Sequence, residues 1–165
     1  MSIIDFVKKI TKKYLKEGKR INLSESPEEL TNKKKGVFVT IKNSGKLRGC
    51  MGTIKSSANL AENLIDCTIS ACDDSRTKPV TEEELPNLNY EVNLINPIKK
   101  LKTNEKTNPE KEGLLVRADG KTGVLLPNLD GINSFEKQLT IAKRKAGIYS
   151  EDCEIYKFTT QKYHG

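Results

Sequence analysis

The sequence has no tryptophan, nine other aromatic residues and a single histidine, His164. Aromatic rings for stacking nucleic-acid bases are therefore scarce. One histidine excludes a serine–histidine–aspartate triad or an HExxH metal site, unless His164 folds back onto another element. No apolar run approaches the roughly 18 residues that cross a bilayer, and the first six residues lack the pattern of a secretion signal. We therefore expect a cytoplasmic protein with no membrane segment.

The four cysteines show no closely spaced pair. They are Cys50, Cys67, Cys72 and Cys153. A structural zinc site is normally built from close pairs of cysteine and histidine ligands. In a chain without a secretion signal, cysteines stay reduced. We therefore expect four free thiols, no metal site and no cofactor.

The positive charge of the chain is confined to its first quarter. Residues 1–46 hold 12 basic and 5 acidic residues, whereas residues 47–165 hold 17 of each, so the first segment accounts for the net charge of +7. Such a segment can attract phosphate groups or an acidic partner. However, only five of the 29 bases are arginines, the residue that binds guanines and phosphates with two hydrogen bonds. We interpret these lysines as a solvated face and rank nucleic-acid binding below that.

The sequence pattern predicts an α+β protein, mainly antiparallel sheet packed with helices. At 165 residues we expect a single domain over residues 1–165, or two small subdomains sharing one core. Hydrophobic periodicity, capping residues and turns predict the elements in chain order. The first are a helix over 3–17, paired strands over 36–42 and 47–54, and a helix over 58–72 capped by Ser57. A helical turn opened by a capping box at Thr81 and Glu84 follows, then a strand over 88–95 and a connecting loop over 96–112. The last are a hairpin over 113–126, a helix opened by Asn133 and Glu136 and ending near Ala146, and a strand over 154–160.

The segment 47–52, Leu-Arg-Gly-Cys-Met-Gly, is the strongest candidate for chemistry. Two glycines in a strand indicate a bulge or the close approach of another group. In a regular strand Arg48 and Cys50 share a face, so the guanidinium would lower the pKa of Cys50 and make it nucleophilic. The N–H groups near Gly49 and Gly52 would bind an oxyanion or a carboxylate. The alternative is a bulged strand with a small buried cysteine and an ion-paired arginine.

Three further charged residues are candidates for binding a ligand. Asp74 and Arg76 lie two residues apart in a loop after the predicted 58–72 helix. They either orient a substrate or fix the loop. Glu91 lies on the polar face of the 88–95 strand, where it either lines a cleft or is solvated.

The chain resembles the AMMECR family, and the resemblance rests on several segments in order. Residues 36–41 and 47–52 are similar to its signature, whose hallmark is LRGCIG, with Met51 in place of isoleucine. Residues 74–77 stand where the family has Asp-Pro-Arg-Phe, with Ser75 and Thr77 as departures. Residues 81–86, 90–92, 123–127 and 144–148 complete the match.

The resemblance implies an α+β fold with an antiparallel sheet and a smaller subdomain beside it. It also implies a role alongside, or fused to, a radical SAM enzyme and a Memo-like or extradiol-dioxygenase-like protein, as in the AmmeMemoRadiSam set. It names no reaction. We expect an enzyme or enzyme component in which Cys50 and Arg48 act on a small molecule or protein group, or a non-catalytic module that binds a partner or ligand.

Overall fold

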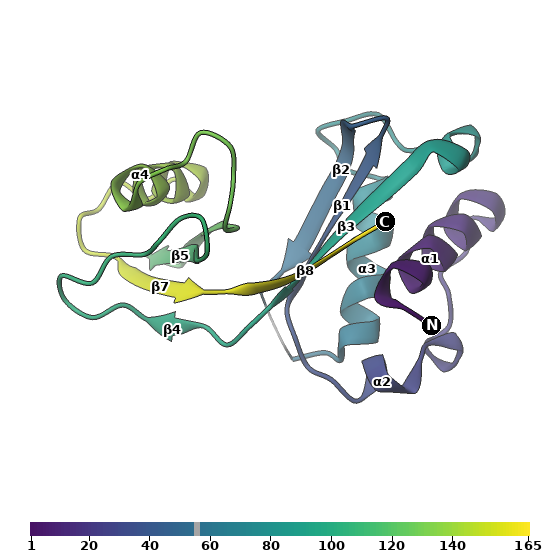
Figure 1. Cartoon of the computed structure of the whole chain (residues 1–165), viewed down its shortest axis with the longest axis horizontal. Coiled ribbons are helices and arrows are strands. Elements are labelled where there is room, and N and C mark those ends of the chain that lie inside the picture. Colours follow the sequence, from purple (N-terminus) through teal and green to yellow (C-terminus); the bar gives the residue numbers. More distant parts are fainter. Residues whose placement is uncertain (55–56) are drawn as a thin grey trace. The chain divides into compact units, whose positions relative to one another are not determined.

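The computed structural model describes residues 1–54 and 57–165, and the chain divides into two compact units (Figure 1). The first unit comprises Met1–Leu94 and Gln161–Gly165, and the second comprises Ile95–Thr160. Each unit has a four-stranded sheet and its own cluster of buried hydrophobic side chains. The predicted α+β class is confirmed. Among the described residues, no helix has the length and apolar character needed to cross a membrane.

The helices of the first unit begin and end at side chains or glycines that suit those positions. Its helical elements are α1 (Ile3–Glu17), η1 (Leu23–Glu25), α2 (Glu28–Thr31), α3 (Leu60–Cys72) and η2 (Glu82–Asn87). Ser2 and Asp5 form a capping box at the start of α1, and Gly18, at φ 65°, ends it. The predicted cap of α3 was wrong: Asn59, rather than Ser57, accepts a hydrogen bond from the Glu62 N–H at 2.9 Å.

The sheet of the first unit has the strand order β2-β1-β3-β8. Its strands are β1 (Val37–Asn43), β2 (Lys46–Thr53), β3 (Leu88–Ile95) and β8 (Thr160–His164). β1 pairs with β2 and β3 in antiparallel fashion. Tyr90 and Gly165 exchange both main-chain hydrogen bonds, at 2.8 and 3.0 Å. That exchange is the signature of an antiparallel pair, and it sets His164 opposite Glu91.

The two faces of this sheet differ in composition. The face toward the helices carries Val37, Val39 and Ile41 of β1, which join buried side chains of α1 and α3 in one hydrophobic cluster. Because strand side chains alternate between faces, the intervening residues lie on the opposite face. We call this opposite face the polar face; its members include Thr40, Cys50, Glu91, Lys162 and His164.

The second unit packs one helix on a second antiparallel sheet. Its strands are β4 (Lys99–Lys100), β5 (Gly113–Ala118), β6 (Lys121–Leu125) and β7 (Glu154–Phe158), in the order β4-β7-β5-β6, with α4 over Phe135–Ala146. Three sequence predictions need correction here. The segment 96–112 contains the short strand β4, and Ser134 rather than Asn133 or Glu136 is the N-cap of α4. The predicted strand 154–160 is β7 followed by the start of β8, which belongs to the other sheet.

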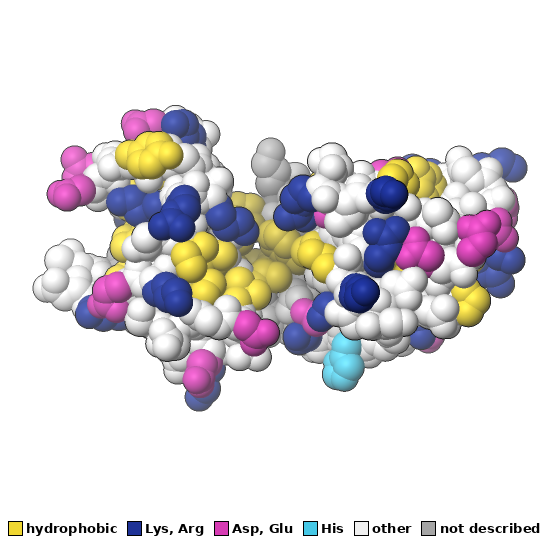
Figure 2. Space-filling model, turned by 90° about the horizontal axis from the view of Figure 1, so that it is seen from above, with side chains coloured by type: hydrophobic (Ala, Val, Ile, Leu, Met, Phe, Trp, Pro, Cys, Tyr) yellow, Lys and Arg dark blue, Asp and Glu magenta, His cyan; other side chains and the backbone are white. Residues whose placement is uncertain are grey.

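The lysines of α1 lie on two sides of the helix. Lys13 forms an ion pair with Glu25 at 2.8 Å, and the Lys9 ammonium donates to the Glu25 carbonyl at 3.3 Å. Lys8, Lys12 and Lys16 are exposed. On the face of the molecule drawn in Figure 2, basic and acidic side chains are interspersed.

In both units a strand glycine allows a helix backbone to pack directly on the sheet. A Cβ atom on Gly49 of β2 would lie 1.8 Å from the Ala71 carbonyl oxygen of α3. A Cβ atom on Gly123 of β6 would lie 2.2 Å from the Ala142 carbonyl oxygen of α4. Neither position has room for a side chain. The close approach predicted at the 47–52 segment is therefore confirmed at Gly49.

We predict that Gly49→Ala lowers the free energy of unfolding by about 1–3 kcal/mol, because the added methyl group forces β2 and α3 apart. Urea denaturation followed by circular dichroism measures this. Leu47→Ala, at an exposed position of the same strand, is the control and should change stability little. Equal stability of the two variants would contradict the packing described.

Candidate functional site

Strand β2 contains a bulge at Arg48. Gly49 lies opposite Ile41, and Leu47 lies opposite Lys42, so Arg48 has no counterpart on β1. A bulge turns a side chain away from the regular alternation of the strand. The bulge predicted from the two glycines is confirmed. Because the bulge interrupts the alternation of side chains, Arg48 and Cys50 need not lie on the same face of the strand.

The main chain around Cys50 is held by side chains of the loop that follows α3. The Cys50 N–H donates to Oδ2 of Asp74 at 3.0 Å, and Nη2 of Arg76 donates to the Cys50 carbonyl at 2.9 Å. Two residues before Cys50, the Arg48 carbonyl accepts a hydrogen bond from the Thr77 hydroxyl at 2.6 Å. These side chains satisfy the edge of β2 as a neighbouring strand would.

Asp74 and Arg76 form an ion pair that fixes this loop. The Asp74 side chain is only 3% exposed and accepts from Nη2 of Arg76 at 2.6 Å. The Arg76 N–H and Nε donate to its other oxygen at 3.1 and 2.9 Å. The hydrogen bonds from Arg76 hold the pKa of Asp74 well below its usual range, against the opposing effect of burial. Asp74 is therefore ionised at neutral pH, and the carboxylate that the Cys50 N–H binds is the chain's own.

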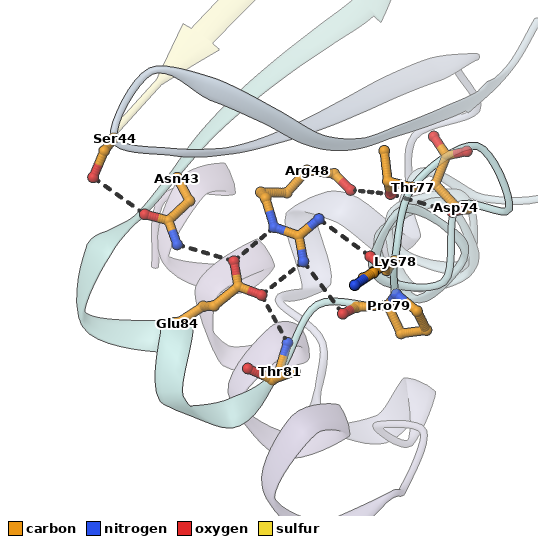
Figure 3. Close-up of polar contacts among 9 residues, drawn as sticks. All are labelled: Asn43, Ser44, Arg48, Asp74, Thr77, Lys78, Pro79, Thr81 and Glu84. Atoms are coloured by element: carbon orange, nitrogen blue, oxygen red, sulfur yellow. Dashed lines mark hydrogen bonds and ion pairs between the residues drawn. The ribbon is translucent and has the colours of Figure 1, made fainter.

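Arg48 forms a second ion pair, with Glu84 of η2 (Figure 3). Its Nε and Nη2 donate to the two carboxylate oxygens at 2.6 and 2.7 Å, and its other donors reach the carbonyls of Lys78 and Pro79 at 3.1 and 3.2 Å. The hydrogen bond with Glu84 raises the pKa of Arg48 and, reciprocally, lowers the pKa of Glu84 to about 2. Sequence reasoning expected this guanidinium beside the Cys50 thiol. In the structure Arg48 is instead ion-paired in a bulged strand, as in the alternative interpretation of the 47–52 segment.

Glu84 is a residue whose role sequence reasoning missed. It was identified only as part of the capping box with Thr81, and it does accept from the Thr81 N–H at 3.1 Å. It also accepts from the Asn43 side-chain amide at 2.9 Å. No local signal marks the partnership with Arg48, because 36 residues separate the two.

On the polar face, four side chains form one row across the four strands. Cys50 lies opposite Thr40, Thr40 lies opposite Glu91, and Glu91 lies opposite His164. Sγ of Cys50 and Oγ1 of Thr40 are hydrogen-bonded at 3.2 Å. Neighbouring strands are about 4.8 Å apart, so Glu91 lies about 10 Å and His164 about 14 Å from Cys50 along the row. The structure thus brings the single histidine to the sheet that carries Cys50.

Glu91 is the anionic member of this row. Its carboxylate pairs with Lys162 at 3.0 Å and with Lys42 at 3.7 Å, and it accepts from the Asn93 amide at 3.3 Å. Burial opposes its ionisation, but the hydrogen bond and charge of Lys162 outweigh that effect and lower the pKa of Glu91. Glu91 is therefore an ionised group held by cations.

The surroundings of Gly52, Cys67 and Cys72 indicate that these residues serve packing. A Cβ atom on Gly52 would lie 2.2 Å from the Phe38 ring, so this glycine makes room for that ring. Cys67 and Cys72 are buried, and burial raises their pKa values to about 11 and about 12. All four cysteines are free thiols, and within residues 1–54 and 57–165 no cluster of three or more metal-ligating side chains occurs.

Comparison with known proteins agrees with this architecture. The sequence model of the AMMECR1 family matches residues 4–163. The chain belongs to the AMMECR1 family. A Thermotoga maritima relative is 38% identical over 161 residues, which cover 94% of this chain and 92% of that protein. The crystal structure of the uncharacterized protein PH0010 from Pyrococcus horikoshii superposes with a TM-score of 0.87 at 30% identity, covering 98% of this chain and 89% of that one.

A third relative is a longer protein. The protein CA_C1420 of Clostridium acetobutylicum is 41% identical over 139 residues, which cover 82% of this chain but only 30% of that protein. In that organism the AMMECR1 region is therefore one part of a larger polypeptide.

We predict that Glu84→Gln lowers the free energy of unfolding by about 2 kcal/mol at pH 7, because one charged partner of a largely buried pair is lost. The folded-state pKa of Glu84 is lowered to about 2 from 4.5, so its contribution is complete above pH 4.5 and declines as the pH falls toward 2. The difference between wild type and variant should therefore be constant from pH 7 to 5 and shrink by pH 3.

Urea denaturation at these pH values tests this. Glu82→Gln is the matched control, since Glu82 forms only an exposed pair with Lys16 at 3.6 Å. A Glu84→Gln effect as small as that of the control would contradict a structural role for the Arg48–Glu84 pair.

Proposed function

We propose that this AMMECR1-family chain is an enzyme, or a component of one, whose reacting group is the Cys50 thiol. The substrate is a small molecule or a protein-borne group that lies along the row of Cys50, Thr40, Glu91 and His164. The observation that carries the proposal is that Cys50 has both main-chain polar groups fixed by Asp74 and Arg76 while its side chain is partly exposed. A thiol that only filled the core would not need that support.

Two polar side chains lie close to Cys50. The Thr40 hydroxyl, 3.2 Å from the sulfur, can donate a hydrogen bond to a thiolate. Arg76, rather than Arg48, is the guanidinium beside Cys50, because its Nη2 donates to the Cys50 carbonyl at 2.9 Å. A cation and a hydroxyl donor are the groups that activate cysteine nucleophiles.

The proposed step is a displacement at an electrophilic carbon. The thiol proton passes to water, the sulfur electron pair forms the new bond to carbon, and the leaving group departs with the electron pair of the broken bond. Glu91 and His164 lie too far along the row to accept the thiol proton directly. They would instead contact the distal part of a substrate, with Lys42 and Lys162 offering positive charge there.

We predict that iodoacetamide modifies Cys50 faster than Cys153 at pH 7, and leaves the buried Cys67 and Cys72 unmodified until the protein unfolds. Peptide mass spectrometry resolves the four sites. Thr40→Val keeps the side-chain shape and removes the hydroxyl, so it should slow Cys50 modification about five-fold. Thr122→Val, at an exposed position of β6, is the control and should leave the rate unchanged. Modification of Cys50 no faster than Cys153 would contradict the proposal.

A second candidate is a non-catalytic module that binds a partner, with a radical SAM enzyme and a Memo-like or extradiol-dioxygenase-like protein as the proposed partners. It is supported by the longer Clostridium acetobutylicum relative, of which the matched region is 30%. The two candidates differ in their need for the thiol. A Cys50→Ala variant that supports a partner's reaction as well as the wild type would favour the binding module.

A further inference from the structure

A groove on the first unit lies between α1 and the segment 82–90, apart from the row on the polar face. It has a volume of about 500 Å³ and is lined by Lys8, Lys12, Lys16, Glu82, Leu85, Pro86, Leu88 and Tyr90. That volume is within the range of sites that bind ligands. One wall is thus a row of lysines, and the other side is mainly apolar.

The lysines of the groove have fewer close partners than the other α1 lysines. Lys13 forms an ion pair with the Glu25 carboxylate at 2.8 Å, and Lys9 donates to the Glu25 carbonyl at 3.3 Å. Among residues 1–54 and 57–165, no carboxylate lies within 4 Å of the Lys8 or Lys12 ammonium groups, and Lys16 has only the exposed pair with Glu82 at 3.6 Å. Asp5, which accepts a hydrogen bond from Ser2 at 2.7 Å, interacts with the charge of Lys8 from beyond ion-pair distance. The groove therefore has a surplus of positive charge on one wall.

The spacing of these lysines suits a linear ligand. Positions four apart on a helix are about 6 Å apart along its axis. In an extended peptide, side chains on one side recur about every 6.8 Å. An extended segment in the groove would therefore present alternate side chains to Lys8, Lys12 and Lys16. The intervening side chains would face Leu85, Pro86 and Leu88.

We propose that this groove binds an extended acidic segment of a partner protein, in which aspartate or glutamate alternates with apolar residues. The acidic side chains pair with the three lysines, and the apolar ones cover the opposite side. A purely polar anion would leave the apolar side uncovered, and a purely apolar ligand would desolvate the lysines without compensation. The charge surplus of the first 46 residues also speeds the encounter with an acidic segment.

The test uses a fluorescein-labelled heptapeptide of alternating leucine and glutamate, with binding followed by fluorescence anisotropy at 50 mM salt. We expect saturable binding to the full chain. The triple variant Lys8→Gln, Lys12→Gln, Lys16→Gln should weaken it about ten-fold, because three ion pairs are lost. The matched control is Lys33→Gln, Lys34→Gln, Lys35→Gln, which removes the same charge from the same quarter of the sequence and should leave binding within about two-fold. Circular dichroism verifies that both variants fold.

Three results would overturn the proposal. Equal weakening by the two triple variants would mean that the peptide responds only to net charge. Equal binding of a peptide of alternating serine and glutamate would remove the apolar side from the interaction. Tighter binding of a 20-base-pair DNA duplex, lost in the groove variant and competing with the peptide, would identify the lysine row as a nucleic-acid surface.

Discussion

The carboxylate of Asp74 receives hydrogen bonds from the Cys50 N–H and from three donors of Arg76, and it is almost completely buried. An ionised group in that position needs all of these donors, because burial without them is costly. Their presence ties the loop after α3 to the edge of β2. This carboxylate, together with the pairing of β2 with β1, holds the main chain at Cys50.

Gly49 and the two arginines of this region have separate roles. Gly49 lets the last turn of α3 pack against β2, which brings the Asp74 loop within reach of Cys50. Arg48 leaves the strand at the bulge and joins β2 to η2 through Glu84. Arg76 stays beside Cys50. The guanidinium of Arg48, two residues before Cys50, thus has a structural role. The guanidinium of Arg76, in the loop after α3, contacts the main chain of Cys50, the candidate nucleophile.

Local sequence signals predicted what depends on local interactions. The apolar spacing of residues 3–17 and the stop at Gly18 predicted α1, and the paired glycines predicted the bulge. Helix starts shifted by one or two residues where a second good N-cap residue lies nearby, as with Ser57 and Asn59. The strand pairing of residues 154–164 could not be predicted. A run of residues typical of extended strands carries no signal for the point at which the chain passes from one sheet to another.

The parts of the site that local signals do not predict are contacts between distant segments of the chain. The Arg48–Glu84 pair and the position of His164 opposite Glu91 both join residues far apart in the chain. Periodicity carries no information on such contacts. Asp74 and Arg76 were identified because they lie two residues apart in one loop, but their attachment to Cys50 emerges only when α3 packs against β2.

The claim that Asp74 positions Cys50 is tested most directly by the hydrogen exchange of the Cys50 amide, measured by NMR. In the wild type this amide should exchange slowly at neutral pH, like the amides of a paired strand, although β2 is an edge strand. In Asp74→Ala, which removes the acceptor, its exchange should be at least about 100-fold faster, with little change at Val39, inside the sheet. Equal exchange of the Cys50 amide in the two proteins would contradict the account.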